Sequence, residues 1–508
     1  MTAGNLTGAL STHRAAKAWS NVDWDKAERF VYRLQVRIAK AISLGKYNKA
    51  KALQWLLTRS HYAKLLAVKR VCESQGSKTP GVDGELWRCA SSKYRASLNL
   101  NTRGYRALPL RRIYIPKRNG KRRPLSIPTM KDRAMQALYL LALLPIAETK
   151  ADRSSYGFRP ERSAHDALQH CYIAFAGNNK AQWVLDADIE GCFDNISHQW
   201  LLENIPIDKR VLTRWLDAGF IESQSFSPTT GGVPQGGVIS PTLANIALDG
   251  LEVIIREAGK GRKVNFIRYA DDFIATADSK DLLEDTIIPL IDKFLATRGL
   301  RLSSEKTRIV HIDDGFDFLG FFIRKYQGKY LSKPSKANVK SFTREIKQVV
   351  RRGYGHSGAA LIRQLNPKIR GWANYYRIGV AKATYAKMDN YIYKVCMHWV
   401  MRKYSYHCRY KAVDKYFRRR SAMRGWIFSD LNVKSNGIKE VVAITKMMDV
   451  RIQRHVLIRG NANPFDAAYC DYFQKRKQWK KSQSGIQRRA DRRIYAKMQS
   501  SLLPDASL

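Results

Sequence analysis

Two short apolar runs that flank a pair of adjacent aspartates constrain the fold of this chain more than any other feature. In FIRYADDFIATAD (266–278), apolar residues precede and follow Asp271 and Asp272. A strand, a tight turn and a second strand would place both carboxylates at the tip of a β-hairpin. Carboxylates held there need solvent, a base or a cation to neutralise them. Because Asp also favours turns, a simple solvated turn is an open alternative for this stretch alone.

A second acidic stretch, QWVLDADIEGCFDNISH (182–198), has the pattern of a strand that ends in a site. Side chains alternate along a strand, so Asp186 and Asp188 would share one face. The Asp194–Asn195 pair could instead cap the helix that follows. If the two strands are neighbours, Asp188 and Asp271 could share two Mg²⁺ ions, which prefer oxygen ligands and can clamp both oxygens of a phosphoryl transfer.

The charge of the chain points to a polyanionic partner. Lys and Arg number 90 against 43 Asp and Glu, a net charge of +47. After residue 330, 39 basic residues stand against 10 acidic ones. Such a field concentrates nucleic acid, and an anionic membrane is the alternative. The apolar run ALYLLALLPIA (137–147) is too short to span a bilayer, so it predicts a buried helix, and we expect no membrane partner.

The start of the sequence and the positions of its cysteines bear on the location of the protein and on disulfide or zinc sites. The sequence opens without a secretory signal, and its seven cysteines are scattered with no C-x-x-C pair. We therefore expect a cytoplasmic protein, associated with the nucleoid or with ribonucleoprotein. We expect neither a disulfide framework nor a cysteine zinc site.

The periodicity of the sequence divides it into four stretches. Residues 24–73 carry apolar residues at helical spacing and predict two or three amphipathic helices. Residues 74–84 form a turn-rich loop. Between about 103 and 329, short strand-like runs alternate with helical ones, which is typical of an α+β fold with hairpins. After residue 330 the pattern is helical and basic.

Ordered blocks of sequence run along nearly the whole chain. They are GSKTPGVDG (76–84), YIPKRNGKRRPLSIPTMKDRAMQ (114–136), SYGFRPERSAHDAL (155–168), DIEGCFDNISH (188–198), GGVPQGGVISPTLANI (231–246), RYADD (268–272), LSSEKT (302–307), FDFLGF (316–321) and LNPKIRGWANYY (365–376). In this order they resemble the reverse transcriptase/maturase proteins encoded by group II introns. The small departures are Ser126, where glycine is commoner, and Glu161. Neither departure touches the expected chemistry.

The resemblance implies a right-hand polymerase with fingers, an antiparallel palm sheet, a helical thumb and a basic C-terminal DNA-binding region. The implied domains are an N-terminal helical extension (1–73), fingers and palm (74–330), a thumb/maturase domain (331–410) and a DNA-binding domain with a basic tail (411–508). Many relatives continue into a nuclease with paired cysteines and histidines. After Cys470 this sequence has neither residue, so we expect no endonuclease and a primer supplied from elsewhere.

The resemblance also assigns chemistry to individual residues. Three carboxylates would be catalytic: Asp188, Asp271 and Asp272. Two Mg²⁺ ions, or Mn²⁺ in their place, would be held by Asp188, Asp271 and the backbone carbonyl of Ile189. Deoxynucleotide contacts would come from Lys117, Arg123, Phe193, Gln235, Gly236 and Lys306. Phe193 would leave no room for a 2′-hydroxyl, and packing in the core is its alternative role. Glycine at 236 would allow a close backbone approach to the nucleotide.

Basic residues in the last third of the chain are expected to contact nucleic acid. The candidates for RNA or DNA contacts are Arg344, Lys347, Arg351, Arg352, Arg418, Arg419, Arg420, Lys475, Arg476 and Lys477. Aromatic residues among them could stack on unpaired bases. For Trp372, however, a position in the core is the favoured interpretation.

The function that the resemblance implies is RNA-directed DNA synthesis, combined with binding of the group II intron RNA as a splicing maturase and support of intron mobility. The implied partners are the intron RNA, target DNA, an RNA template with its primer, and deoxynucleoside triphosphates, with a homodimer left open. Two alternatives are a catalytically silent RNA-binding maturase and a domesticated or defence-associated reverse transcriptase. The intact aspartates argue against the first, and the LNPKIRGWANYY block argues against the second.

Overall fold

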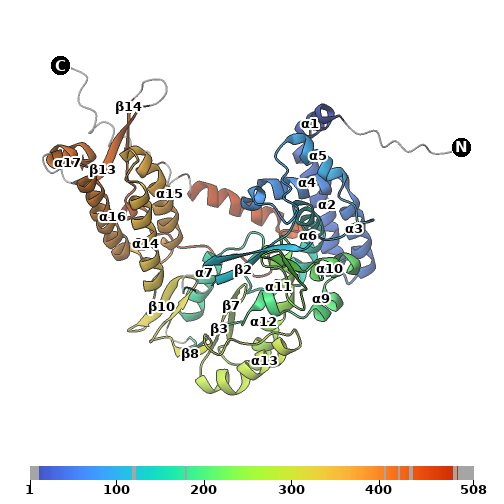
Figure 1. Cartoon of the computed structure of the whole chain (residues 1–508). Helices are drawn as coiled ribbons and strands as arrows, with labels where there is room; N and C mark the ends of the chain where they lie inside the picture. Colours follow the sequence, from blue (N-terminus) through green and yellow to red (C-terminus); the bar gives the residue numbers. More distant parts are fainter. Residues whose placement is uncertain are drawn as a thin grey trace. The chain divides into compact units, whose positions relative to one another are not determined.

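A computed structural model describes residues 11–116, 120, 122–177, 180–404, 408–421, 424–433, 439–483, 485 and 489 (Figure 1). The chain divides into two compact units. Unit 1 comprises Met1–Cys171, Ala181–Ile309 and Ile458–Asp471. Unit 2 comprises Tyr172–Lys180, Val310–Leu457 and Tyr472–Leu508. Within the described residues, no helix has the length and apolar character needed to cross a membrane.

Unit 1 begins with a helical layer. Its elements are α1 (Thr12–Ser20), α2 (Trp24–Ser43), α3 (Tyr47–Arg59), α4 (His61–Glu73), the 3₁₀ turn η1 (Gln75–Lys78) and α5 (Ala90–Leu98). The expectation of two or three helices within residues 24–73 is confirmed by α2, α3 and α4. The side chain of Asp23 accepts the N–H of Lys26 and caps α2. Both α2 and α4 pack on α6 (Met130–Lys150), the buried helix predicted from the apolar run (Figure 1).

Two four-stranded sheets complete the scaffold that positions the carboxylates. The first, in the order β2-β1-β4-β5, contains β1 (Leu110–Pro116), β2 (Arg122–Ile127), β4 (Phe220–Glu222) and β5 (Ser225–Ser227). The second, in the order β6-β7-β3-β8, contains β3 (Trp183–Asp188), β6 (Asn265–Tyr269), β7 (Asp272–Ala277) and β8 (Arg308–His311). In this second sheet β7 pairs antiparallel with both β3 and β6. The second sheet therefore contains both acidic stretches on neighbouring strands.

Shorter helices connect and cover these strands. They are α7 (Ala164–Phe175), α8 (Cys192–Asn195), α9 (His198–Asn204), α10 (Lys209–Leu216), α11 (Ser240–Leu248), α12 (Leu251–Ala258), the π-helix η2 (Leu282–Ile287) and α13 (Ile288–Ala296). Strand β7 is buried from Phe273 to Ala277, which makes it the centre of the hydrophobic core. The mixture of helices and hairpins confirms the α+β interpretation of this region.

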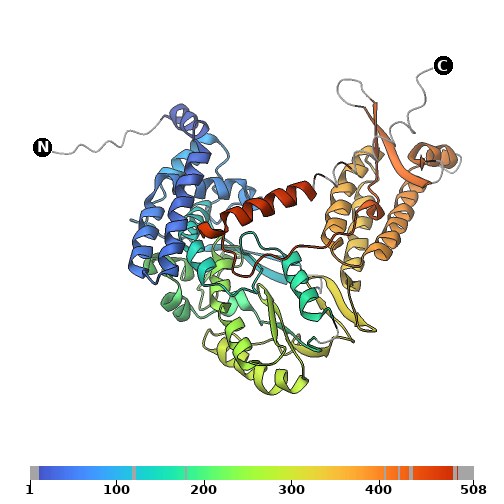
Figure 2. The same ribbon diagram turned by 180° about the vertical axis from the view of Figure 1, so that it is seen from behind.

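Unit 2 is built around three helices. They are α14 (Lys336–Arg352), α15 (Gly358–Tyr376) and α16 (Lys382–Lys403), which lie side by side in both views (Figure 1, Figure 2). Trp372 of α15 stacks on Phe342 of α14, with ring centroids 4.9 Å apart and planes 19° apart. The expected packing role of Trp372 is confirmed, because its ring joins two helices.

The helical interpretation of everything after residue 330 is wrong for residues 417–421, 424–433 and 439–443. After α17 (Arg409–Tyr416), the chain forms the sheet β12-β13-β14, from β12 (Phe417–Ser421), β13 (Arg424–Val433) and β14 (Lys439–Ala443). Another sheet, β11-β10-β9, lies before the helices, with β9 (Phe316–Phe318), β10 (Phe321–Tyr326) and β11 (Lys329–Pro334). In β12 the run of arginines hides the strand signal, and Phe417, buried opposite Phe428 of β13, supplies its packing.

The end of the chain contributes to both units. After the 3₁₀ turn η4 (Met447–Asp449), residues 458–471 belong to unit 1 and include η5 (Ala467–Tyr469). There the N–H of Ile458 donates to Asp166, and Arg162 donates to the carbonyl oxygen of Gly460 at 2.8 Å. Residues 470–483 are helical. The stretch 411–508, which the sequence treats as one region, is thus divided between the two units.

Candidate active site

The end of β3 and the β6–β7 hairpin bring three carboxylates to one edge of the β6-β7-β3-β8 sheet. Asp188, the last residue of β3, lies directly opposite Asp272, the first residue of β7. Asp271 lies in the two-residue turn that joins β6 to β7, as the hairpin interpretation predicts. Two stretches about eighty residues apart in the sequence therefore meet at one place.

The turn that carries Asp271 has a strained backbone. Ala270 adopts a φ of 61°, a left-handed conformation that costs a non-glycine residue roughly 1–3 kcal/mol. Gly157 approaches this turn so closely that a Cβ at 157 would lie 2.4 Å from the amide nitrogen of Ala270. Only glycine permits that approach. The turn is therefore held in its conformation by a neighbouring loop.

Every second residue from Asp186 in β3 to Glu190, two residues after the strand ends, is acidic, and each of these three acids pairs with a basic residue of the segment 301–308. We call these pairs the charge ladder: Asp186–Arg308 (3.0 Å), Asp188–Lys306 (2.5 Å) and Glu190–Arg301 (2.7 Å). The backbone follows the same register, because the N–H of Ser303 donates to the carbonyl oxygen of Asp188 at 2.8 Å. Each acid of the ladder is therefore balanced by its own basic partner.

The two adjacent carboxylates at the start of β7 have raised pKa values. Burial raises the pKa of Asp271, and the nearby charge of Asp188 raises it further, whereas Arg123 and Lys306 oppose the shift. Burial raises the pKa of Asp272 to about 8, with Asp186 as the next cause. A pKa above the ordinary range means that additional positive charge would stabilise the ionised site.

The donor atoms fit a hard divalent cation. In the described part of the chain, no three His, Cys, Asp or Glu side chains converge on a ready-made metal site. Mg²⁺ in nucleotide-transfer sites is commonly held by one or two carboxylates together with water and substrate phosphates. Asp188, Asp271 and the adjacent backbone of Ile189 supply such oxygens. The ammonium of Lys306, 2.5 Å from Asp188, shows that this position accommodates positive charge.

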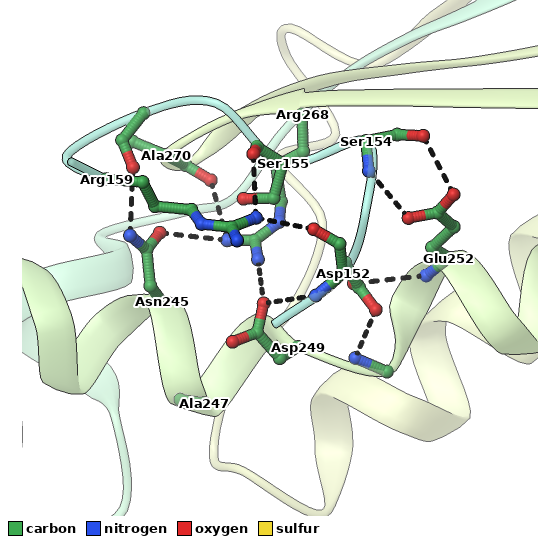
Figure 3. A network of polar contacts seen from close by, with 12 residues as sticks. Asp152, Ser154, Ser155, Arg159, Asn245, Ala247, Asp249, Glu252, Arg268 and Ala270 are labelled. Atoms are coloured by element: carbon green, nitrogen blue, oxygen red, sulfur yellow. Dashed lines mark hydrogen bonds and ion pairs between the residues drawn. The ribbon is translucent and has the colours of Figure 1, made fainter. Parts of the chain in front are cut away.

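A buried polar network lies beneath the turn (Figure 3). Arg268, at 0% exposure, pairs with Asp249 at 2.5 Å through one terminal nitrogen. The other terminal nitrogen donates to Asn245 at 3.1 Å and to the carbonyl oxygen of Ala270 at 3.5 Å. The arginine thus joins α11 to the strained residue next to Asp271. It is a positioning residue for the turn.

The loop before α7 extends the same network. Asp152 accepts the backbone N–H groups of Gly250 and Glu252, and Glu252 accepts both the N–H and the hydroxyl of Ser154 (Figure 3). Arg159 donates to the carbonyl oxygens of Asp152 and Ser155. These contacts hold the loop that contains Gly157, the glycine that packs against Ala270 in the β6–β7 turn.

The residues predicted to contact a deoxynucleotide occupy different environments. Lys117 lies outside the described residues. Arg123 is exposed on β2 and acts electrostatically on Asp271. Phe193 on α8 is half-buried against the core, a position compatible with both of its proposed roles. Lys306 is bound to Asp188.

The segment at 235–236 is tied to β2. The backbone N–H of Ser126 donates to the carbonyl oxygen of Gln235, whose side chain donates to Asp194 at 2.9 Å. Gly236 has a φ of 122°, and a Cβ there would lie 2.8 Å from the carbonyl oxygen of Ser126. The requirement for glycine therefore comes from the chain itself. A close approach of this backbone to a nucleotide stays a prediction.

The capping interpretation of the Asp194–Asn195 pair is wrong. Helix α9 is capped by Ser197, whose hydroxyl accepts the N–H of Trp200 at 3.3 Å. Asp194 instead accepts the Gln235 side chain.

The basic residues proposed for nucleic-acid contacts differ in exposure. Arg344, Lys347, Arg351 and Arg352 are all exposed on α14. Arg418 lies on β12, and the side chains of Arg419 and Arg420 lie outside the described residues. Lys475 and Lys477 are exposed on the helix 470–483. Arg476 is buried and donates to the carbonyl oxygen of Val456 at 2.9 Å, so it is a packing residue.

Arg268, Arg301 and Arg308 were not predicted from the sequence, and Lys306 was predicted only as a nucleotide contact. A signal existed for Arg268, because an arginine inside an otherwise apolar strand needs a buried acid. For the ladder, the basic residues of RLSSEKTR (301–308) gave a signal only once their strand was known to adjoin β3.

Comparison with known proteins places three matches in order along the chain. Residues 19–100 match the N-terminal domain of reverse transcriptase, residues 115–323 the reverse transcriptase (RNA-dependent DNA polymerase) family, and residues 339–417 the group II intron maturase-specific domain. The chain is 34% identical over 310 residues to Protein YkfC of Escherichia coli (strain K12), covering 52% of this chain and 81% of that protein.

Similarity to longer relatives is partial. The chain is 27% identical to the group II intron-encoded protein LtrA of Lactococcus lactis subsp. cremoris, over 56% of this chain and 59% of that protein. It is 25% identical to a 91 kDa protein of the cob intron of Schizosaccharomyces pombe, over 63% of this chain and 49% of that protein. Among solved structures, a telomerase from Candida albicans has a TM-score of 0.36 at 13% identity, over 61% of each chain.

Proposed function

This chain belongs to the family of reverse transcriptases and maturases encoded by group II introns, which synthesise DNA on RNA and bind RNA, and we propose that Asp188, Asp271 and Asp272 carry its polymerase chemistry. The observation that supports this most strongly is the meeting of Asp188 with the Asp271 turn at one edge of a sheet. The raised pKa values of Asp271 and Asp272 add a second reason, because the site favours positive charge.

We further assign the parts of a right-hand polymerase. The β6-β7-β3-β8 sheet would be the palm, and the β1–β2 hairpin would belong to the fingers. The helices α14, α15 and α16 would be the thumb. These assignments follow the order of the family matches along the chain.

In the proposed mechanism the protein positions the primer and a deoxynucleotide at the carboxylate edge. Asp188 and Asp271, with the carbonyl of Ile189, would hold Mg²⁺ ions, for which Mn²⁺ can substitute. When bound, such ions lower the pKa of the primer 3′-hydroxyl and stabilise charge on the α-phosphate and on the pyrophosphate that leaves. Asp272 would complete the acidic site less directly, and Arg268 would hold the turn that carries Asp271 through its contact with Ala270.

The nucleotide itself would contact neighbouring elements. Arg123 and Lys117 would bind the triphosphate, the arginine through its planar fork. Lys306, released from Asp188, would become a further contact for phosphate. Phe193 would lie under the sugar and exclude a 2′-hydroxyl, and the Gln235–Gly236 backbone would approach the base or sugar.

We propose group II intron RNA and an RNA template with its primer as the nucleic-acid partners, and target DNA as the partner in intron mobility. The maturase-specific match supports a role in splicing. The excess of 39 basic residues over 10 acidic ones after residue 330 supports a strongly salt-dependent interaction with these polyanions. The proposed location is the cytoplasm, in association with the nucleoid or with ribonucleoprotein.

Primer extension on poly(rA) with an oligo(dT) primer, dTTP and Mg²⁺ tests the function. The full-length protein should extend the primer, and Asp271→Asn should lower the rate roughly 10²–10³-fold. Asp278→Asn, an exposed aspartate paired with Arg262 at the other end of β7, is the matched control and should retain activity. If wild type and Asp271→Asn both fail to extend, yet both bind intron RNA and restore splicing, the protein is a maturase without polymerase activity.

A further inference from the structure

A hollow of about 500 Å³ opens between α14 and α16 in unit 2. Its apolar lining consists of Val350, Val395 and Met401. Its polar and aromatic lining consists of Lys347, Arg351, Tyr354, His398 and Arg402. We call these eight residues the α14–α16 hollow. Three of them are permanent cations, two carry planar rings, and none is acidic.

Two hydrogen bonds brace the helices that form the hollow. Tyr391 of α16 donates to the carbonyl oxygen of Thr343 of α14 at 3.2 Å. Eight residues further along α16, just over two turns, the indole of Trp399 donates to the carbonyl oxygen of Gly353 at 2.9 Å. The hollow begins between these braces and extends one turn beyond the second. Because both braces tie side chains to backbone, the hollow is a fixed feature of the packed helices.

The lining of the hollow supplies no carboxylate to its cations. Helices α14 and α16 contain two acids, Glu345 and Asp389. Glu345 pairs with a lysine of α15 at 2.5 Å, and Asp389 accepts two backbone N–H groups from residues 447 and 448. Within the described part of unit 2, no ion pair reaches Lys347, Arg351 or Arg402. An anion bound from outside would relieve their mutual repulsion.

Exposed cations lead into the hollow along both helices. Those on α14 recur at intervals of three or four residues and share one face: Lys340, Arg344, Lys347 and Arg351. Those on α16 are Lys387, Lys394 and Arg402. This arrangement suits a chain of phosphates more than one isolated anion.

The interior of the hollow suits a planar, weakly polar group. The guanidinium of Arg402 lies 4.8 Å from the centre of the Tyr354 ring, so a flat cationic and aromatic surface borders the space. His398 adds a second ring, and Val350 is buried beneath. Nucleobases stack on such surfaces, and a base can enter only where it is not paired in a helix. The volume lies within the ordinary range for a small-molecule site.

We infer that the α14–α16 hollow binds one unpaired nucleotide of an RNA strand. Its phosphate lies against Lys347 and Arg351, and its base enters between the Tyr354–Arg402 surface and His398. The inference rests on the RNA-binding function proposed above and deepens it, because it gives unit 2 a means to recognise bulges and loops within a folded RNA.

The test compares two RNA hairpins that differ in one nucleotide. One hairpin carries a single bulged 2-aminopurine, and the other carries the same base paired to uracil. Full-length protein should bind the bulged hairpin about tenfold more tightly and should change its 2-aminopurine fluorescence through stacking. Arg351→Ala and His398→Ala should remove most of the preference and the fluorescence change.

Arg352→Ala is the matched control, because Arg352 is the next residue of α14, equally charged and exposed, but does not line the hollow. It should lower affinity for both hairpins alike and keep the preference. The inference is overturned if Arg351→Ala and Arg352→Ala behave identically, if wild type shows no preference, or if a DNA hairpin with the same bulge binds equally well. Primer extension by the same preparations separates the two proposals, since a protein that extends primers and binds RNA without preferring the bulge refutes only this inference.

Discussion

The carboxylate site of unit 1 and the α14–α16 hollow of unit 2 differ in whether their charged side chains are paired. Around the site, basic side chains meet acids in defined pairs, from the charge ladder on β3 to the buried Arg268–Asp249 pair. Around the hollow, three cations share a space with no acid. The first region pairs its own charges and buries carboxyls whose pKa values are raised, whereas the second depends on an external polyanion.

This difference in charge pairing indicates different roles for the two regions: the first fixes the positions of side chains, and the second provides affinity for a partner. Paired charges hold side chains in place, which suits a reaction that needs fixed positions. Unpaired cations bind a partner strongly but in many registers, unless a shaped pocket selects one of them. We therefore expect substitutions in unit 1 to change stability and rate, and substitutions in the hollow to change RNA recognition.

The largest effect on stability is expected from Arg268→Met. The substitution leaves Asp249 buried without its partner, and breaking a buried ion pair costs about 3–5 kcal/mol. Urea unfolding of the full-length protein should show that loss. Arg262→Met removes an ion pair in which both partners are partly exposed and should cost about 1 kcal/mol or less. Equal losses in the two variants would break the contrast between buried and exposed pairs.

An intermediate effect is expected at Phe193. If its ring excludes a 2′-hydroxyl, Phe193→Ala should lower the preference for dTTP over UTP on poly(rA) about 10- to 100-fold in kcat/KM. Phe193→Tyr keeps the ring and should keep the preference. A variant that loses stability while its sugar preference is unchanged would assign Phe193 to core packing alone.

A pH dependence is expected at the buried pair, and its effect is the smallest when it is measured over a single pH unit. Burial raises the pKa of Asp249 from 3.8 to about 7, against the opposing charge of Arg268. Between these values the folded protein holds a proton that the unfolded chain has released, so the free energy of unfolding falls as pH rises. The slope from this group is at most about 1.4 kcal/mol per pH unit. Asp249→Asn should flatten the fall between pH 5 and pH 7 in denaturant titrations, and an unchanged slope would refute the raised pKa.

The sequence predicted those parts of the fold and site that depend on local pattern. Apolar spacing located α2, α3, α4 and α6, and the apolar runs around Asp271 located the β6–β7 hairpin. Alternation on β3 placed Asp188 at the end of a strand, and only the pairing of β3 with β7 was left to the tertiary structure.

The features that the sequence did not predict depend on tertiary contacts. The position of Arg268 inside an apolar strand indicates that it needs a buried acid, but only the tertiary structure identifies that acid as Asp249. The arginine-rich β12 has no strand-like alternation, because its packing comes from Phe417 against a strand that follows later in the sequence. The hollow likewise cannot be predicted from the sequence of one helix, since α14 supplies three of its lining residues, α16 four, and the turn after α14 supplies Tyr354.

The most direct test of the proposed catalytic centre compares two acids of the charge ladder, each of which is paired with a basic side chain. Asp188 and Glu190 both face a basic partner in the charge ladder, but only Asp188 lies opposite the Asp271–Asp272 turn. The measurement is single-turnover addition of one dTMP to an oligo(dT) primer on poly(rA), at saturating Mg²⁺. The account predicts that Asp188→Asn slows this step roughly 10²–10³-fold, whereas Glu190→Gln stays within a few-fold of wild type. Equal rates for the two variants would contradict the placement of the catalytic centre at the meeting of β3 and the β6–β7 turn.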